Sequence, residues 1–454
     1  MNDTDKGRER IRRVLNASSL SILCRVITVA TMFLTTPLIL RYLGEELFGV
    51  WMTISSLVAL LGILDLGVGN SLINVIAKAH GSNDREQTIS VVRSASAALI
   101  VIAFFYIVIS FLFQNSYNWA KIYNLNNLEN TTEVARASMI LIICLAATLP
   151  FTVVQKVQFG FQEAVQANAW TACSNLLVLA LILLAIFYQA NLSWLVFIVA
   201  GTPGIVMMLC WINQFARVRP WLRPRPVKVR LKSATNLMKM SGVWTVFNLV
   251  AFLVMGLDNL IISYLFGAKA VGGYAVMAKI HGALLFAQIF TMPLWPAFAE
   301  AISSGDFMWA RQTFYKTLVA CSLIGIFTAC IIGFGSFAFV RFWVGPEMIP
   351  TISLAVGFAI WAFICNFFAA ISALMSNVHM IRTLTILTTA AALSAIVLKF
   401  FLAKNVGIEG VVWASSIAYS LVCIPALYIA GKALNKESKN TNEYVNKRIN
   451  KEEA

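Results

Sequence analysis

Long apolar blocks, separated by short polar segments, run through almost the whole chain. A helix needs about 20 consecutive apolar residues to cross a bilayer, and each block reaches that length. The pattern predicts an all-α integral membrane protein with about twelve transmembrane helices. The expected spans are 16–40, 47–76, 92–114, 136–160, 167–189, 193–214, 240–266, 271–298, 314–340, 350–376, 381–403 and 409–431.

The composition agrees with this prediction, because 59% of the residues are hydrophobic and only 12% are charged. A soluble domain carries about 25% charged residues. The eight cysteines all fall inside apolar blocks without a C-x-x-C pair, and the three histidines are scattered. We therefore expect neither a disulfide framework nor a metal site.

Lysine and arginine indicate the orientation of the chain, since cytoplasmic loops of membrane proteins carry an excess of both. With a cytoplasmic N-terminus, and with residues near the span ends counted on the adjoining side, two of the 35 basic residues lie within spans, seven lie on the outer side, and 26 lie on the cytoplasmic side. The asymmetry predicts that both termini are cytoplasmic. The outer seven are Arg41, Lys121, Arg136, Lys269, Arg341, Lys399 and Lys404.

The polar segments divide the chain into five parts. A basic N-terminal segment (1–15) precedes the first six-helix half (16–214), a basic cytoplasmic linker (215–239), the second six-helix half (240–431) and a charged cytoplasmic tail (432–454). The linker contains the sequence RVRPWLRPRPVKVRLK. It fixes topology in the simpler interpretation, and in the other it also contacts anionic lipid headgroups or a pyrophosphate.

The two halves share a short sequence pattern. Gly44, Gly49 and Trp51 correspond to Gly267, Gly272 and Tyr274 at a constant offset of 223 residues. Each half has an even number of expected spans, so the two copies have the same orientation. The pattern predicts a parallel repeat around an axis normal to the membrane, with a central cavity between the halves.

Four charged residues lie well inside expected spans, away from the span ends: Arg25, Asp65, Asp258 and Lys279. Ionisable groups at this depth are costly, so they face a bundle interior or a wet cavity and pair with one another or mark a pathway. We expect a cavity role for the group as a whole. The alternative is a set of interhelical ion pairs, of which Arg25 with Asp65 is one.

Further polar residues lie on the same helix faces. In span 16–40 they recur every three or four residues and form a stripe: Ser18, Ser21, Arg25, Thr28, Met32 and Thr35. In span 240–266, Trp244 and Asn248 share a face. Such faces either line a cavity or form a seam between helices, where serine and threonine are common. We predict that Ser21, Thr28, Trp244 and Asn248 line the cavity.

The sequence contains no catalytic pattern of the Walker A, G-x-S-x-G or H-E-x-x-H type. Its largest outer loop, around residues 115–135, is too short to hold an enzyme domain. We therefore expect a protein that is not an enzyme.

Three segments resemble the Wzx-type polysaccharide flippases of the multidrug/oligosaccharidyl-lipid/polysaccharide exporter superfamily. They are TTPLILRYLGEELFGVWMTISS (35–56), ILDLGVGNSLINVIAKAHG (63–81) and MGLDNLIISYLFGAKAVGGYAV (255–276). The resemblance covers the whole chain in architecture and is most specific from Thr35 to Gly81.

The resemblance implies a flippase of the bacterial inner membrane that moves undecaprenyl-pyrophosphate-linked oligosaccharide repeat units to the periplasmic leaflet. Their polymerisation into O-antigen or capsule follows there, so the polymerase and the chain-length machinery are possible partners. No nucleic acid and no cofactor are expected, and the driver would be a gradient of H⁺ or Na⁺. Arg25 and Lys279 would contact pyrophosphate or acidic sugars. Asp65 and Asp258 would couple ions or pair with the cations.

Three other functions stay open. A drug/cation antiporter of the same superfamily would share twelve spans and buried acids, although cations inside the spans suit an anionic cargo better. A lipid II flippase would resemble a plan of fourteen spans rather than twelve. A scaffold for polysaccharide assembly would not need the polar stripe in the first span.

Overall fold

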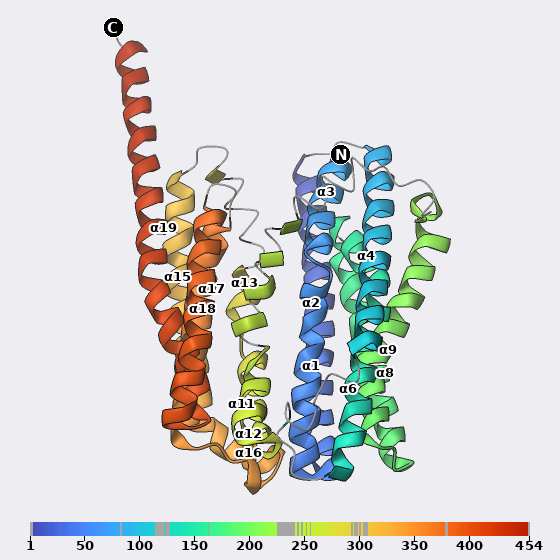
Figure 1. Ribbon diagram of the computed structural model, residues 1–454. Helices are drawn as coiled ribbons and strands as arrows, with labels where there is room; N and C mark the ends of the chain where they lie inside the picture. Colours follow the sequence, from blue (N-terminus) through green and yellow to red (C-terminus); the bar gives the residue numbers. More distant parts are fainter. Residues whose placement is uncertain are drawn as a thin grey trace. The chain divides into compact units, whose positions relative to one another are not determined.

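The computed structural model is helical throughout the residues that it describes (Figure 1). These are 3–81, 84–113, 123, 128–161, 163–224, 241–242, 245–246, 248–250, 252–254, 256–291, 294, 298, 301–302, 307–376 and 380–452. The chain forms two compact units. The first comprises Met1–Phe252 with Phe266–Val271, and the second comprises Leu253–Leu265 with Gly272–Ala454.

The first unit is built from long helices joined by short turns. In chain order its elements are α1 (Asp3–Ser56), η1 (Leu57–Leu60), α2 (Leu61–Leu64), α3 (Val68–Gly81), α4 (Arg85–Phe113), α6 (Leu128–Thr148), η3 (Leu149–Thr152), α7 (Val153–Gly160), α8 (Ala164–Phe187), α9 (Leu192–Asn213), η4 (Gln214–Val218) and η5 (Pro220–Leu222).

The second unit contains the remaining elements, except that the last residue of α11 and the first four of α12 group with the first unit. In chain order these elements are α11 (Asp258–Phe266), α12 (Ala268–Ala283), α13 (Ala287–Thr291), α15 (Phe307–Cys330), η7 (Ile331–Gly335), α16 (Ser336–Trp343), η8 (Pro346–Met348), α17 (Ile352–Met375), α18 (Ile381–Val406) and α19 (Glu409–Glu452). In Figure 1 the C-terminal helix α19 extends well beyond α15 and α18 of its own unit. The predicted tail 432–454 thus continues the last span as a helix as far as Glu452.

Ten helical stretches in the described part of the chain are long and apolar enough to cross a membrane. They correspond to ten of the twelve expected spans, and the multi-span all-α fold is confirmed. The other two expected spans, 47–76 and 271–298, are not continuous helices. The first is interrupted between α2 and α3, and the second is interrupted between α12 and α13.

The two interrupted helices begin at equivalent glycines. Gly44 and Gly267, which the repeat pairs at an offset of 223 residues, both adopt a positive φ, of 73° and 87°. This left-handed conformation costs glycine little, whereas a Cβ makes it unfavourable for other residues. The internal repeat thus marks the same backbone turn in each half.

Each unit has its own apolar core. In the first, buried residues of α3, α4 and α7 such as Leu72, Val92 and Val154 pack together. In the second, α15, α17, α18 and α19 supply the core, with Phe314 and Leu374 fully buried. Many large apolar side chains point outward on the long helices, as expected for surfaces that face lipid.

Candidate functional site

Asp65 lies at the interruption between α2 and α3. It is the C-terminal capping residue of α2, and the next two residues, Leu66 and Gly67, have positive φ values of 49° and 70°. The Asp65 side chain is 3% exposed. Its Oδ1 accepts the Gly67 N–H at 2.9 Å, and its Oδ2 accepts the Gly69 N–H at 3.2 Å. The buried carboxylate thus satisfies amides that the helix break leaves without helical partners, at the positive end of α3.

Lys156 approaches this carboxylate from α7. Pro150 lies in the 3₁₀ turn η3, which separates α7 from α6 within the expected span 136–160. The Lys156 side chain packs against Gly69, and its positive charge acts on Asp65. The first unit therefore places a lysine beside its buried aspartate, on a different helix.

A short polar chain continues from Lys156. The Lys156 ammonium lies 3.5 Å from Asn70 Oδ1, and Asn70 Nδ2 donates to Asn248 Oδ1 at 3.4 Å. Asn70 and Asn248 are both partly buried. These two amides and the ammonium provide donors and acceptors suited to polar cargo inside an otherwise apolar bundle.

Asp258 is the centre of a second polar cluster, in the second unit. It is the first residue of α11, where the helix dipole favours a negative charge. Tyr274 of α12 donates its hydroxyl to Asp258 Oδ2 at 2.6 Å. Lys399 of α18 forms an ion pair with Asp258 Oδ1. Three helices of this unit thus meet at one carboxylate.

The Lys399 side chain is fully buried. Besides the carboxylate, its ammonium donates to the backbone carbonyl oxygen of Val254. Val254 is a helical residue that lies shortly before the turn at Gly256 and Leu257, and α11 begins after this turn. A buried ammonium is tolerated where it is paired and hydrogen-bonded, and Lys399 satisfies both conditions.

Lys399 corrects the sequence analysis, which counted it among the cations of the outer side. Lys156, counted on the cytoplasmic side, is likewise placed next to a buried aspartate. Both lysines lie within expected spans, 136–160 and 381–403. Their position inside expected spans was the one feature of the sequence that could have placed them with the four intramembrane charges.

The structure describes some of the residues predicted to line a cavity. The Thr28 hydroxyl accepts a hydrogen bond from Asn175 of α8 at 3.0 Å, so Thr28 lies in a seam between α1 and α8. Asn248 contacts Asn70, as described above. Lys279 lies in α12 and is partly buried. Trp244 and the side chains of Arg25 and Ser21 lie outside what the structure describes.

The start of the basic linker is anchored to the first unit. Arg219 forms two hydrogen bonds with the Glu163 carboxylate, at 2.6 and 2.8 Å, and its guanidinium lies 4.1 Å from the centre of the Phe161 ring. Leu222, three residues after Arg219, is fully buried. Residues 225–239 lie outside the described residues, so lipid or pyrophosphate contact by the linker stays a prediction.

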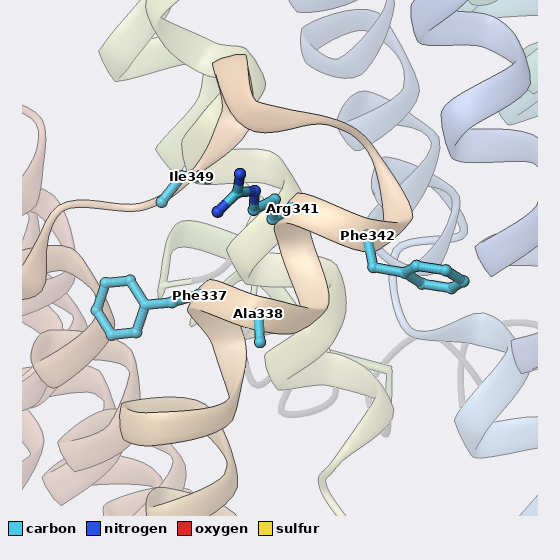
Figure 2. A pocket seen from close by; sticks show the side chains of 5 residues that line it. All are labelled: Phe337, Ala338, Arg341, Phe342 and Ile349. Atoms are coloured by element: carbon cyan, nitrogen blue, oxygen red, sulfur yellow. The ribbon is translucent and has the colours of Figure 1, made fainter.

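A hollow of about 500 Å³ opens near the end of α16 and is lined by Phe337, Ala338, Arg341, Phe342 and Ile349 (Figure 2). In Figure 2 the Arg341 side chain points toward Ile349, whereas Phe342 points to the opposite side of the helix. Arg341 is among the cations expected on the outer side. An exposed arginine between phenylalanines is common at a membrane–water boundary. Within the described ranges, no group of three or more His, Cys, Asp or Glu is arranged to hold a metal.

Solved structures with the same fold are membrane transporters. A multidrug resistance MATE family transporter of the MOP superfamily matches with a TM-score of 0.75 at 13% identity, over 93% of this chain and 96% of that chain. The lipid II flippase MurJ matches with a TM-score of 0.64 at 14% identity, over 94% and 90%. At these identities the similarity shows the fold alone.

Sequence relatives point to one family within this fold. A "Putative O-antigen transporter" of Salmonella typhi is 24% identical over 435 residues, which are 92% of this chain and 97% of the relative. A "Putative O-antigen export protein" of Yersinia pseudotuberculosis is 25% identical over 303 residues, 64% of this chain and 65% of the relative. Residues 14–302 match the family described as polysaccharide biosynthesis protein. Because this match covers well over half of the chain, the protein belongs to that polysaccharide biosynthesis family.

Proposed function

We propose that the protein is a flippase that carries a lipid-linked oligosaccharide across the bacterial inner membrane. The observation that carries the proposal is the similarity to the Salmonella typhi relative, which extends over nearly the full length of both chains. A similarity of this extent includes both halves and the linker. The names of the relatives also favour a transporter over an enzyme.

The cargo in this proposal is an undecaprenyl-pyrophosphate-linked repeat unit of O-antigen or capsule type. The polar groups inside the helical units support a charged, hydroxyl-rich cargo. Lys156, Asn70 and Asn248 form one polar chain at the interrupted helix of the first unit. Arg25 and Lys279 remain the candidates for pyrophosphate or acidic sugars.

The proposed mechanism is alternating access driven by an H⁺ or Na⁺ gradient, with both termini in the cytoplasm. Interrupted helices at membrane depth are typical of substrate and ion sites in transporters, and each half contains such interruptions. Asp65 lies at such an interruption, beside Lys156. We assign Asp65 as the candidate for ion coupling.

Deletion and complementation test the proposal. In a strain that lacks the gene, long-chain surface polysaccharide should be lost while sensitivity to cationic dyes is unchanged. Plasmid-borne wild type should restore the polysaccharide, and so should Lys404→Ala, which alters an exposed lysine of α18. Unaltered polysaccharide with raised dye sensitivity would instead favour the drug/cation antiporter.

Point variants test the proposed residues in the same strain. Asp65→Asn removes the charge but retains one side-chain oxygen that can accept from the backbone amides at the helix interruption. The variant should therefore insert into the membrane normally but export polysaccharide poorly. Lys156→Ala should also reduce export. Full export by both variants at wild-type protein levels would contradict the assignment of this site, while leaving the flippase proposal to the deletion experiment.

A further inference from the structure

The environment of the Lys399 ammonium consists of oxygen atoms from separate parts of the second unit. One is a carboxylate oxygen of Asp258, and another is the backbone carbonyl oxygen of Val254. The other carboxylate oxygen of Asp258 accepts from Tyr274, which orients the carboxylate. These oxygens belong to the start of α11 and the residues before it, whereas the ammonium reaches them from α18.

A carboxylate oxygen and a free carbonyl oxygen are the groups that hold a small monovalent cation in a protein interior. Val254 lies at the end of a helical segment, since the chain turns at Gly256 and Leu257 before α11 starts at Asp258, and the last carbonyls of a helix have no partner within it. The site is removed from water, since the lysine is fully buried and Asp258 is only 13% exposed. An uncompensated carboxylate at this place would be strongly unfavourable.

We propose that the oxygens around Lys399 form a monovalent-cation site that the chain fills with its own side chain. The lysine acts as a tethered cation, so the site binds a free primary ammonium ion when the side chain is shortened. The site makes Asp258 a charge-pairing residue. What this means for transport rests on the proposed function. The ion-coupling role then falls to Asp65 in the other half.

The test uses the thermal unfolding of the full-length protein in detergent and needs no transport measurement. Lys399→Ala removes the ammonium and most of the side chain, and it leaves a cavity beside Asp258. Methylammonium, Na⁺ and K⁺ are added as chlorides at constant ionic strength, with choline as the balancing cation. Methylammonium at about ten times its dissociation constant should raise the Tm of Lys399→Ala by roughly 1–2 °C.

Two controls give this result its meaning. Lys404→Ala, on the same helix but exposed, should melt like the wild type and show no shift with methylammonium. Asp258→Asn combined with Lys399→Ala removes the anionic partner and should abolish the shift. Equal stabilisation of all variants, or none of Lys399→Ala, would overturn the proposal.

A second set of variants decides the matter if Lys399→Ala does not accumulate. Lys399→Met retains the volume of the side chain without its charge, and should melt well below the wild type because Asp258 is left unpaired. Asp258→Asn combined with Lys399→Met should melt higher than Lys399→Met alone. The pair is not coupled if the Tm of the double variant falls by the sum of the decreases in Lys399→Met and Asp258→Asn. That result would contradict the tethered-cation site.

Discussion

The side chain of Lys156 lies directly against Gly69, so a side chain at position 69 would push it aside. A Cβ atom at position 69 would lie 2.6 Å from Lys156 Cε and 2.5 Å from Asp65 Oδ2. Real Cβ atoms do not approach other heavy atoms this closely. The missing side chain at position 69 therefore lets the lysine and the aspartate lie side by side at the helix break.

Gly69→Ala should displace either Lys156 or the Asp65 carboxylate. Both groups are ends of movable side chains, so the displacement itself costs little, and we expect reduced export with little change in Tm. Gly273→Ala is the matched control, because a Cβ at this position in α12 meets nothing within 4 Å. That variant should be as stable as the wild type or slightly more stable. Normal export by Gly69→Ala would show that the close approach is not needed.

Tyr274→Phe removes the hydroxyl that donates to Asp258 and changes nothing else in the ring. A hydrogen bond to a charged partner contributes about 1.5–3 kcal/mol, so the free energy of unfolding should fall by an amount in this range. Chemical denaturation in detergent measures the change. The exposed Tyr264 of α11 supplies the control, and Tyr264→Phe should have little effect. Equal effects of the two changes would contradict the role of the hydroxyl.

Arg219→Lys preserves the charge at the start of the linker but loses the paired hydrogen bonds to Glu163 and the planar contact with Phe161. A lysine cannot reproduce this two-bond geometry, so we expect a loss on the order of 1 kcal/mol. Limited proteolysis of the linker in detergent should become faster. The variant Arg223→Lys changes an exposed residue four positions later, and its linker should be cleaved at the wild-type rate. Identical cleavage of the two variants would rule out an anchoring role for Arg219.

Tyr123 makes stability depend on pH in the alkaline range. It is 1% exposed and lies 3.1 Å from the hydroxyl of Ser138. Burial raises the pKa of Tyr123 to about 12, from an ordinary value of 10.0. The folded state therefore retains the phenolic proton where the unfolded state loses it. This contribution to stability is fully present below pH 10 and is lost as the pH rises through about 12.

Tyr123→Phe should accordingly flatten the decline of Tm between pH 10 and 12 relative to the wild type. Unfolding curves recorded across this range in one detergent provide the measurement. At neutral pH the variant loses the contact with Ser138 without any titration of the phenol, which gives a separate baseline. A variant whose decline with pH equals that of the wild type would show that another group titrates there.

The helical architecture followed from hydropathy alone, because the length of an apolar block determines whether it can cross a bilayer. Hydropathy does not reveal whether a block is one helix. The blocks 47–76 and 271–298 both contain interruptions, which depend on backbone conformation at residues such as Leu66 and Gly67. The glycine pattern of the repeat was a better guide, since both Gly44 and Gly267 have positive φ.

The aspartates at the two polar clusters could be recognised from the sequence, because each is a charge inside an apolar block. Their lysines were assigned to the membrane surface instead. Lysine has a long flexible side chain that usually extends toward water near the end of a span. Lys156 and Lys399 turn inward, and which way a lysine turns depends on a partner from a distant part of the chain. Such a partner has no signature in local sequence.

Gly44 and Gly267 also bear on how the gene arose. Duplication of an ancestral half would place the same reversal of the chain at both positions. Neighbouring codons could then diverge freely, since many apolar residues serve equally well in a span, whereas the reversal itself admits few replacements. Two glycines with positive φ at equivalent positions are what such a duplication would leave after most other residues have changed.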